Sequence, residues 1–334
     1  MNKHMNKQKR KKKRQILKIL KVTVISLLMM CAATCGILCA RWYVKPFDPV
    51  VMEYMAEGTL EQTADVSKEK CNILILGTDK DGLRTDVMML AQIDPINDKV
   101  VVMSIPRDTR VKYNGRWRKI TEVHAVGYSS AKGATKAEKS VKGSEASIKI
   151  VKELTGVPIH YYAKVNFKAF SDCIDELGGV NFNVPQRMYY NDPAQDLYIN
   201  LNKGMQHLDG DKAEQLVRFR MYKTGDLKRI ETQQNFLHAI VEQKLNAAII
   251  TKIPQIYNIV VGNMETPMGP EDFSKCGMEV LNIGKDKIMT VTFPGVPKDI
   301  AGGSYVIPEY DKLGGFIEEH FGYDENGNNL DAKN

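Results

Sequence analysis

The chain has 334 residues, of which 43% are hydrophobic and 26% charged, a balance typical of folded proteins with enough apolar material for a core. Its formal net charge of +7 is unevenly distributed, because ten of its 47 Lys and Arg residues lie in 1–21, which contains no acidic residue. The other 37 basic residues face 40 acidic ones, so the body carries about −3. This balance excludes a general polyanion-binding role for the folded part.

An uncharged stretch of 19 residues, 22–40, follows the basic segment. As a helix it would span roughly 28 Å, about the thickness of the hydrocarbon core of a bilayer. The preceding lysines predict a cytoplasmic N-terminus, and Trp42 and Tyr43 suit the outer interface. We therefore predict a cytoplasmic tail at 1–21, a single-pass signal-anchor helix at 22–40 and an extracellular remainder on the cell membrane.

Two other interpretations of this N-terminal region are open. A cleaved signal peptide is disfavoured, because the apolar run is long and no small-x-small site follows it. A nucleic-acid-binding arm is disfavoured because the lysines directly precede an apolar span. We therefore expect a lipid bilayer, and no nucleic acid, as a partner.

A mixed polar and apolar stretch at 41–70 is interpreted as a stalk, and three strand-like apolar runs follow it. These runs lie at 72–76, 87–93 and 100–105. Asp79 comes soon after the first run, and Arg107 and Asp108 follow the third. Open α/β sheets place their ligands at such strand ends, so the pattern predicts an α/β fold with a site there.

Helix-like and strand-like patterns alternate through the rest of the chain. Helices are predicted at 146–154, 167–177, 210–219 and 227–246, and strands at 161–165 and 180–184. The segment 127–145 is rich in Ser, Gly, Ala and Lys, which predicts a mobile loop. Residues 324–334 are predicted to be a disordered tail.

Two groups of polar and charged residues are separated by more than a hundred positions. The downstream group consists of Arg218, Arg220, Arg229 and Gln233, and the upstream group of Asp79, Arg84, Asp86 and Arg107. Guanidinium groups bind phosphate well, because their planar fork matches pairs of oxygens and stays charged. Carboxylates would cancel that attraction unless they hold a metal or move a proton, so a diphosphate with a divalent cation is indicated. On spacing alone, surface ion pairs are the alternative.

Six motifs lie in fixed order between Asn72 and Gln243. They are NILILGTD (72–79), LRTDVMMLAQIDP (83–95), VVMSIPRDTRV (101–111), DELGGVNFNVP (175–185), KGMQHLDGDKAEQLVRFR (203–220) and GDLKRIETQQ (225–234). Each motif alone is weak, but their joint order and spacing resemble the LytR-CpsA-Psr family of bacterial envelope proteins. The resemblance implies an α/β/α sandwich around a mixed sheet at 71–323, with an apolar tunnel for a polyprenyl tail.

The resemblance also implies a phosphotransferase of the Gram-positive type of envelope. It would move a glycopolymer, such as wall teichoic acid or capsular polysaccharide, from an undecaprenyl-pyrophosphate carrier to peptidoglycan through a phosphodiester bond. By match to the family motifs, the expected catalytic residues are Asp79, Asp86 and Arg107, and the two aspartates are expected to hold Mg²⁺ (or Mn²⁺). The expected pyrophosphate-binding residues are Arg84, Arg107, Lys119, Arg218, Arg220, Arg229 and Gln233.

The chain departs from the family pattern at 119–124 and at Thr232, where relatives often carry Arg. Two other functions remain open. A pyrophosphate hydrolase would use the same residues with water as acceptor, and sequence does not distinguish the two nucleophiles. A non-enzymatic envelope or transcriptional regulator is the third possibility, although the near-neutral, extracellular body disfavours DNA binding.

Overall fold

The computed structural model describes residues 55–61, 65–79, 81–193, 197–222, 226–324 and 326–333. The chain divides into two units, 1–45 and 46–334, and all described residues belong to the second. The predicted cytoplasmic tail and signal-anchor helix therefore lie outside the described residues. Within the described part, no helix is both long enough and apolar enough to cross a bilayer.

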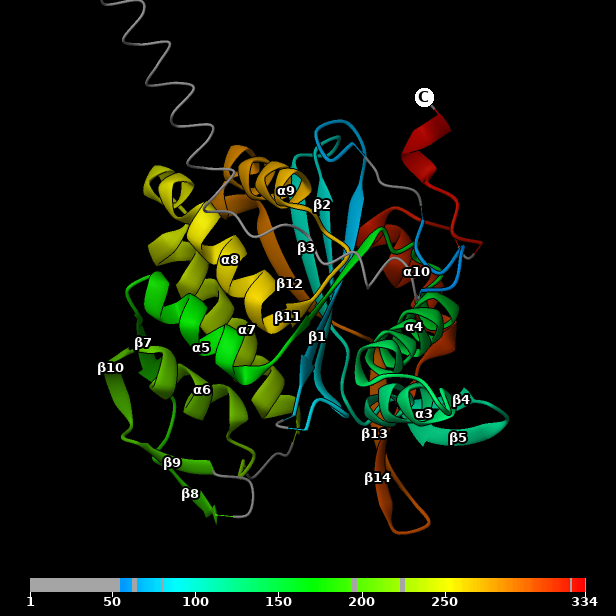
Figure 1. Ribbon diagram of the computed structural model, residues 1–334, viewed down its shortest axis with the longest axis horizontal. Coiled ribbons are helices and arrows are strands. Elements are labelled where there is room, and N and C mark those ends of the chain that lie inside the picture. Colours follow the sequence, from blue (N-terminus) through cyan, green and yellow to red (C-terminus); the bar gives the residue numbers. More distant parts are fainter. Residues whose placement is uncertain are drawn as a thin grey trace, which may run out of the picture. The chain divides into compact units, whose positions relative to one another are not determined.

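A six-stranded mixed sheet forms the centre of the second unit (Figure 1). Its strands, in spatial order, are β11 (Met264–Glu265), β6 (Tyr161–Val165), β1 (Cys71–Thr78), β2 (Thr85–Asp94), β3 (Lys99–Ser104) and β12 (Ile288–Thr292). β2 is antiparallel to both β1 and β3, while β6 is parallel to β1 and β12 is parallel to β3. Four strands, β1, β3, β6 and β12, therefore end at the same edge of the sheet, where the sequence predicts a site.

Helices cover both faces of this sheet, which confirms the predicted α/β fold with a mixed sheet (Figure 1). One face carries α3 (Val123–Ser130), α4 (Lys136–Thr155) and α10 (Tyr310–Phe321), and the other α5 (Phe167–Glu176), α7 (Asp226–Lys244), α8 (Ile253–Asn263) and α9 (Pro270–Ile283). The alternation of side chains along β1 explains why helices pack on both faces of the sheet. Leu74 and Leu76 pack into the core that contains Ile148 of α4, whereas Cys71 packs with Cys276 of α9.

A third core lies beside the sheet and is built largely from short strands and one helix. These elements are β7 (Val180–Val184), β8 (Met188–Asp192), β9 (Leu197–Leu201), β10 (Gly204–Leu208) and α6 (Gly210–Arg218). β7 pairs with β10, and β8 pairs with β9. The inward residues of β9 are Leu197, Ile199 and Leu201, so the β8–β9 hairpin has one buried and one exposed face.

Two further hairpins, β4 (Arg110–Tyr113) with β5 (Arg116–Lys119) and β13 (Gly295–Ile300) with β14 (Gly303–Pro308), stand on the α4 side. A parallel bridge between Thr109 and Val306 joins them. Short 3₁₀ helices complete the described chain, namely η1 (Ile120–Glu122), η3 (Ala247–Lys252), η4 (Lys285–Lys287) and η5 (Leu330–Lys333).

The prediction of a mobile loop at 127–145 is wrong, because α3 and α4 occupy most of that segment. The predicted helix at 146–154 is the second half of α4, which begins at a capping box formed by Thr135 and Glu138. The small residues serve close packing of α3 on α4. A Cβ added to Gly127 would lie 2.6 Å from the Ala146 Cβ.

The described part of the predicted stalk contacts the folded domain. Met55 and Leu60 pack against the core on the α4 side of the sheet, and Val66 is buried in the core on the α9 side. Residues 55–61 and 65–70 therefore belong to the packed domain, because their apolar side chains complete its cores.

The C-terminal segment differs from the predicted disorder at 324–334. Tyr323 forms a β-bridge with Asn329, and Asp331 makes an ion pair with Lys70 at 2.5 Å. The Lys70 side chain is almost fully buried, so it requires an anionic partner. This requirement explains why the described residues of the segment return to the domain.

Candidate active site

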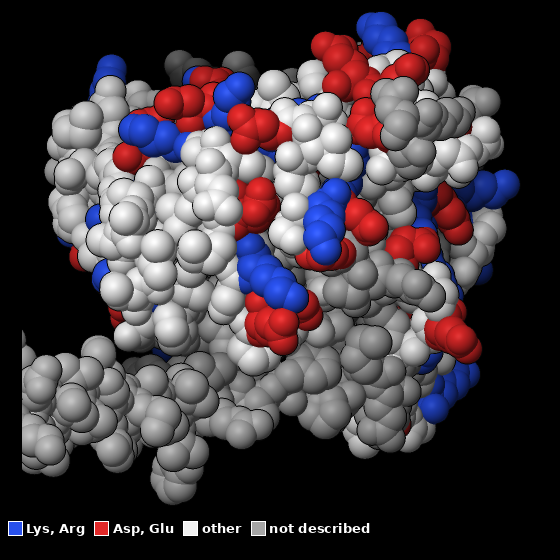
Figure 2. All heavy atoms as spheres, turned by 90° about the horizontal axis from the view of Figure 1, so that it is seen from above, with Lys and Arg blue, Asp and Glu red and all other residues white. Residues whose placement is uncertain are grey.

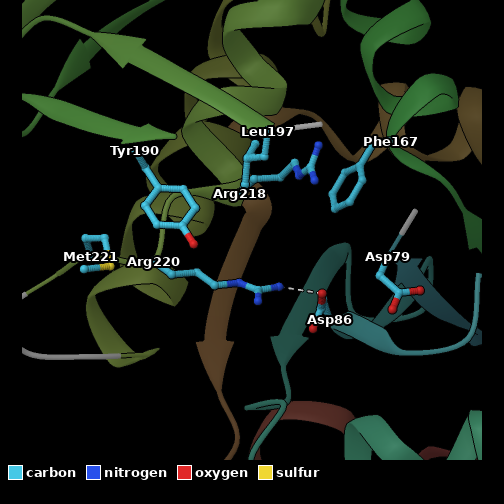
Figure 3. Close-up of a pocket in the computed structure, with 8 residues that line it drawn as sticks. All are labelled: Asp79, Asp86, Phe167, Tyr190, Leu197, Arg218, Arg220 and Met221. Atoms are coloured by element: carbon cyan, nitrogen blue, oxygen red, sulfur yellow. Dashed lines mark hydrogen bonds and ion pairs between the residues drawn. The ribbon is translucent and has the colours of Figure 1, made fainter. Parts of the chain in front are cut away.

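A pocket of about 200 Å³ lies at the sheet edge where β1 ends (Figure 3). Its walls are formed by Asp79, Asp86, Phe167, Tyr190, Leu197, Arg218, Arg220 and Met221. Asp79 directly follows β1, Asp86 is the second residue of β2, and the two arginines lie at and just beyond the end of α6. Two members of the upstream group and two of the downstream group predicted from the sequence therefore line one pocket.

Asp86 is held by arginines from two distant segments. Its Oδ1 accepts a hydrogen bond from Arg107 Nη1 and its Oδ2 one from Arg220 Nη2, both at 2.5 Å. Arg229 Nη2 donates to the main-chain carbonyl of Asp86 at 3.3 Å. Because a guanidinium group has five N–H donors, Arg107 and Arg220 retain donors for phosphate while they hold Asp86.

Asp79 organises the turn between β1 and β2. Its Oδ1 accepts hydrogen bonds from the backbone N–H groups of Leu83 and Arg84, at 3.0 and 3.2 Å. Its own N–H donates to the Arg84 carbonyl at 3.0 Å. Gly82 in this turn has φ of +71°, a conformation that favours glycine. The Arg84 side chain is exposed at the rim of the turn.

Arg218 is oriented before any ligand binds. Its guanidinium lies 4.4 Å from the centre of the Phe167 ring and donates to Glu214 Oε1 at 2.6 Å. Phe219, which follows, is extended and buried, so Arg218 and Arg220 can both reach the pocket. Figure 3 shows the two guanidinium groups on the same side of the pocket as Asp86 and Phe167.

Five predicted ligands are not among the residues that line the pocket. They are Arg84, Arg107, Lys119, Arg229 and Gln233. Lys119 makes an ion pair with Asp108 at 2.8 Å, and Asp108 also lies 3.7 Å from Arg107 Nε. Gln233 donates to the Val217 carbonyl at 3.0 Å.

An apolar cavity of about 180 Å³ adjoins this pocket, and Phe167 contributes to both. Its lining consists of Ile75, Gly77, Val87, Met89, Val165, Asn166, Phe167, Phe170, Val217, Gln233, Phe236, Leu237 and Ile240. The adjacent residues Met88 and Met89 of β2 lie in different environments. Met88 is buried in the core, whereas Met89 lines the cavity.

A buried polar network that was not predicted from the sequence contacts the turn that contains Asp79. Glu265 accepts hydrogen bonds from Lys164 at 2.7 Å and from Ser140, Ser144 and Tyr162. Lys164 Nζ also donates to His124 Nε2 at 3.4 Å, which leaves His124 Nδ1–H to donate to the Leu83 carbonyl at 2.9 Å. The network therefore reaches the turn that carries Asp79.

Burial governs the ionisation of this network. Burial, together with the charge of Lys164, lowers the pKa of His124 to about 4, so its imidazole is neutral at pH 7. Burial alone would raise the pKa of Glu265, but Lys164 and the serine hydroxyls hold it below its ordinary value. Glu265 is therefore an anion inside the protein, and its negative charge stabilises the ammonium of Lys164.

The carboxylates of the pocket determine which kind of metal ion could bind there. Within the described chain, no three His, Cys, Asp or Glu side chains gather into a metal-binding cluster. Asp79 and Asp86 share a pocket, but both oxygens of Asp86 accept hydrogen bonds from arginines. The carboxylates of Asp79 and Asp86 fit a cation such as Mg²⁺, because this ion binds one or two carboxylates and completes its coordination shell with phosphate oxygens and water.

Sequence reasoning also missed the aromatic and apolar walls of the pocket. Phe167 and Tyr190 come from α5 and β8, which the chain brings to the arginines only in the folded state. The paired residues Lys164 and Glu265 are 101 positions apart. A lysine inside the predicted strand at 161–165 was the one available signal, because a charged residue on a buried strand requires a partner.

Comparison with known proteins places this architecture in a family. The LytR_cpsA_psr family model matches residues 51–320. The polyisoprenyl-teichoic acid–peptidoglycan teichoic acid transferase TagU of Oceanobacillus iheyensis is 32% identical over 247 residues, which cover 72% of each chain. Regulatory protein MsrR of Staphylococcus aureus is 29% identical over 231 residues, 67% of this chain and 64% of the relative.

A solved structure supports the same assignment. The crystal structure of Bacillus subtilis TagV superposes with a TM-score of 0.62 at 27% identity, and covers 77% of this chain and 98% of that chain. The family model spans well over half of the present sequence, and the TagU relative exceeds 30% identity across most of both chains. The chain therefore belongs to the LytR_cpsA_psr family.

Proposed function

We propose that this protein transfers a glycopolymer from a polyprenyl-pyrophosphate carrier to peptidoglycan and joins them by a phosphodiester bond. The observation that carries the proposal is the junction, at Phe167, of an arginine-lined pocket with an apolar cavity. A ligand with a diphosphate head and a hydrocarbon tail matches both compartments. The names of the relatives TagU and TagV, both teichoic acid transferases, support the same reaction class.

The chemistry follows from the arrangement of charges. The acceptor hydroxyl oxygen attacks the phosphorus that bears the glycopolymer, a new P–O bond forms, and polyprenyl phosphate leaves with the electrons of the broken bond. Arg107, Arg218 and Arg220 stabilise the negative charge on the phosphoryl oxygens. The hydroxyl proton passes to a carboxylate in the pocket.

Asp79 is the better placed of the two aspartates to accept this proton. Both oxygens of Asp86 accept hydrogen bonds from arginines, whereas the hydrogen bonds described to the Asp79 carboxylate all end on Oδ1. Asp79 and Asp86 would also hold Mg²⁺ (or Mn²⁺) together with the phosphates, and the cation would neutralise part of their charge.

We further propose that the catalytic domain is extracellular and is held at the membrane by the helix predicted at 22–40. An anchor of this kind would raise the effective concentration of the domain near a lipid-linked donor. A teichoic acid is favoured over capsular polysaccharide as the transferred polymer, because TagU and TagV are both named teichoic acid transferases.

The test uses the full-length protein in nanodiscs. It is incubated with a synthetic polyprenyl-pyrophosphate oligosaccharide, Mg²⁺ and peptidoglycan fragments, and the products are identified by mass spectrometry. We expect a phosphodiester-linked adduct that is lost in Arg220→Ala. Release of free sugar phosphate without an adduct would establish the pyrophosphate hydrolase instead.

A regulatory role without catalysis is the second candidate, because one relative is named Regulatory protein MsrR. Absence of turnover with either acceptor, in protein that still binds the donor, would support it. The face shown in Figure 2 does not support a DNA-binding role. In Figure 2, basic and acidic side chains are interspersed over the face that is shown.

A further inference from the structure

The β4–β5 hairpin is the exception to the balanced charge of the body. Residues 110–119, RVKYNGRWRK, contain five basic residues and no acidic one. In the view of Figure 1 this hairpin stands on the other side of β1 from α5 and α6, the helices that border the diphosphate pocket. The hairpin thus lies away from α5 and α6 in this view.

An aromatic and cationic surface connects this hairpin with β14, and we call it the ledge, formed by Arg110, Trp117, Lys119 and Tyr305. The Arg110 guanidinium lies 4.3 Å from the centre of the Trp117 ring and 5.9 Å from that of Tyr305. Lys119 Nζ lies 5.5 Å from the Tyr305 ring. Trp117 is 53% exposed, so much of the indole remains available although Arg110 stacks on it.

The ledge is fixed in position by backbone contacts. The parallel bridge between Thr109 and Val306 joins β4 to β14, and the Val306 N–H donates to the Asp108 carbonyl at 2.9 Å. A surface held in this way presents its aromatic rings with little loss of conformational entropy on binding.

A continuous series of contacts links the ledge to Asp86 in the diphosphate pocket. Lys119 pairs with Asp108, Asp108 lies beside Arg107, and Arg107 donates to Asp86. The apolar cavity adjoins the pocket from the α5 and α7 side. None of the ledge residues lines that cavity, so a donor tail in the cavity would leave the ledge free for the acceptor.

We propose that the ledge is the binding subsite for the acceptor, a glycan strand that carries carboxylate-bearing peptide substituents. This inference rests on the proposed transferase function. The flat apolar faces of sugar rings pack against Trp117 and Tyr305, and Arg110 with the other cations of the hairpin pairs with the carboxylates. Peptidoglycan has both features, whereas a neutral glycan has only the first.

Tryptophan fluorescence provides a binding test that does not depend on catalysis. The chain contains only two tryptophans, Trp42 and Trp117, so Trp42→Phe makes Trp117 the sole reporter. The full-length Trp42→Phe protein in nanodiscs is titrated with peptidoglycan fragments, with chitin oligosaccharides and with anionic phospholipid vesicles. We expect saturable quenching by peptidoglycan fragments, at least about tenfold weaker binding of chitin oligosaccharides, and no response to vesicles.

Kinetics with a matched control complete the test. Trp117→Ala should raise the acceptor KM about tenfold, the loss of one stacking contact, and leave the donor KM unchanged. Tyr189→Ala is the control, because Tyr189 is 66% exposed and its ring lies 5.7 Å from Arg187 on a different hairpin. Arg116→Ala provides a second variant that changes only exposed charge, with an expected two- to threefold rise in acceptor KM.

The outcomes separate this inference from the proposed function. If peptidoglycan quenches Trp117 but no transfer occurs, peptidoglycan binding at the ledge is confirmed, and the transferase proposal fails together with the acceptor role of the ledge. If transfer occurs and neither Trp117→Ala nor the titration shows an effect of the ledge, the subsite is overturned. A Trp117 response to anionic vesicles alone would overturn it in favour of a membrane-contacting surface.

Discussion

Two carboxylates in this protein are held by cations in opposite ways. Asp86 lines a pocket. Its own side chain is 9% exposed and that of Arg107 is 18% exposed, but its other partner, Arg220, has a side chain that is 45% exposed. Glu265 lies behind the sheet edge, where its own side chain is 14% exposed and that of Lys164 is 9% exposed. Ser140, Ser144 and Tyr162 supply further donors to Glu265.

The difference indicates that the arginines on Asp86 serve ligand binding, whereas the Lys164–Glu265 pair stabilises the fold around the site. The arginines on Asp86 retain donors for a ligand. The guanidinium of Arg220 is exposed enough for water to replace its carboxylate partner at modest cost. The ammonium of Lys164 is surrounded by protein, so the loss of its anion would leave a buried, unpaired charge. The second arrangement is linked to the first, because His124 connects Lys164 to the Leu83 carbonyl in the Asp79 turn.

The largest effect is expected when the buried pair is broken. Glu265→Gln should lower the free energy of unfolding by about 3–5 kcal/mol, because Lys164 would keep its charge without an anion. Urea denaturation followed by circular dichroism measures the change. Glu309→Gln removes the partner of the exposed Lys312 and should leave the midpoint unchanged. Equal midpoints for the two variants would show that burial of the Lys164–Glu265 pair does not make its loss more costly.

The converse is expected at Asp86. Asp86→Asn should reduce the rate of transfer by about 10²–10³-fold, because Arg107 and Arg220 lose the anion that orients them. Its urea midpoint should stay close to that of the wild type. Asp172→Asn, which breaks an exposed pair with Lys168, is the control for both measurements. A large loss of stability with full activity would reverse the roles assigned to the two carboxylates.

The third effect concerns pH and the coupling residue His124. Its folded pKa of about 4 lies below the ordinary value of 6.5, so the unfolded state binds more protons between these values. Stability is therefore fully present above pH 6.5 and should fall by about 3 kcal/mol as the pH approaches 4. The lowered pKa of Glu265 adds a separate loss at the acidic end, as the pH falls through it.

His124→Gln should flatten this dependence, since glutamine does not titrate yet can donate to Leu83 and accept from Lys164. Urea midpoints measured at intervals from pH 7 to pH 4 provide the comparison. His320→Gln, outside the network, should retain the wild-type slope. A variant at His124 with an unchanged slope would show that other groups cause the acid sensitivity.

The sequence predicts those features that arise from local patterns. The apolar runs around Leu74 and Leu90 gave β1 and β2 to within two residues, because alternation and turn residues act over short distances. Asp79 and Arg107 follow strands that are parallel to one another, so strand ends alone placed them at a common edge. This is why the sequence could predict that Asp79 and Arg107 lie at the same edge of the sheet.

Features that depend on distant partners were not predicted. Gly127 and Gly143 suggest a loop by composition. In the folded chain they allow α3 and α4 to pack closely, a reason that the local sequence does not show. Lys164 and Glu265 have no common motif. The same is true of Trp117 and Tyr305, whose hairpins are joined only in the folded chain. The Glu265 network, the aromatic walls of the pocket and the ledge thus all depend on contacts between residues far apart in the sequence.

The smallest effect is expected in the apolar cavity, where no charge is involved. Ile240→Thr places a hydroxyl on the cavity wall and should weaken binding of the donor tail by about 1 kcal/mol, a roughly fivefold rise in KM. The rise should appear with a long polyprenyl donor and be absent with a donor of two isoprene units, because a short tail does not reach Ile240. Val296→Thr on the exposed face of β13 is the matched control. An equal change with both donors would mean that Ile240 acts on the phosphate pocket, and the cavity would lose its role as the tail site.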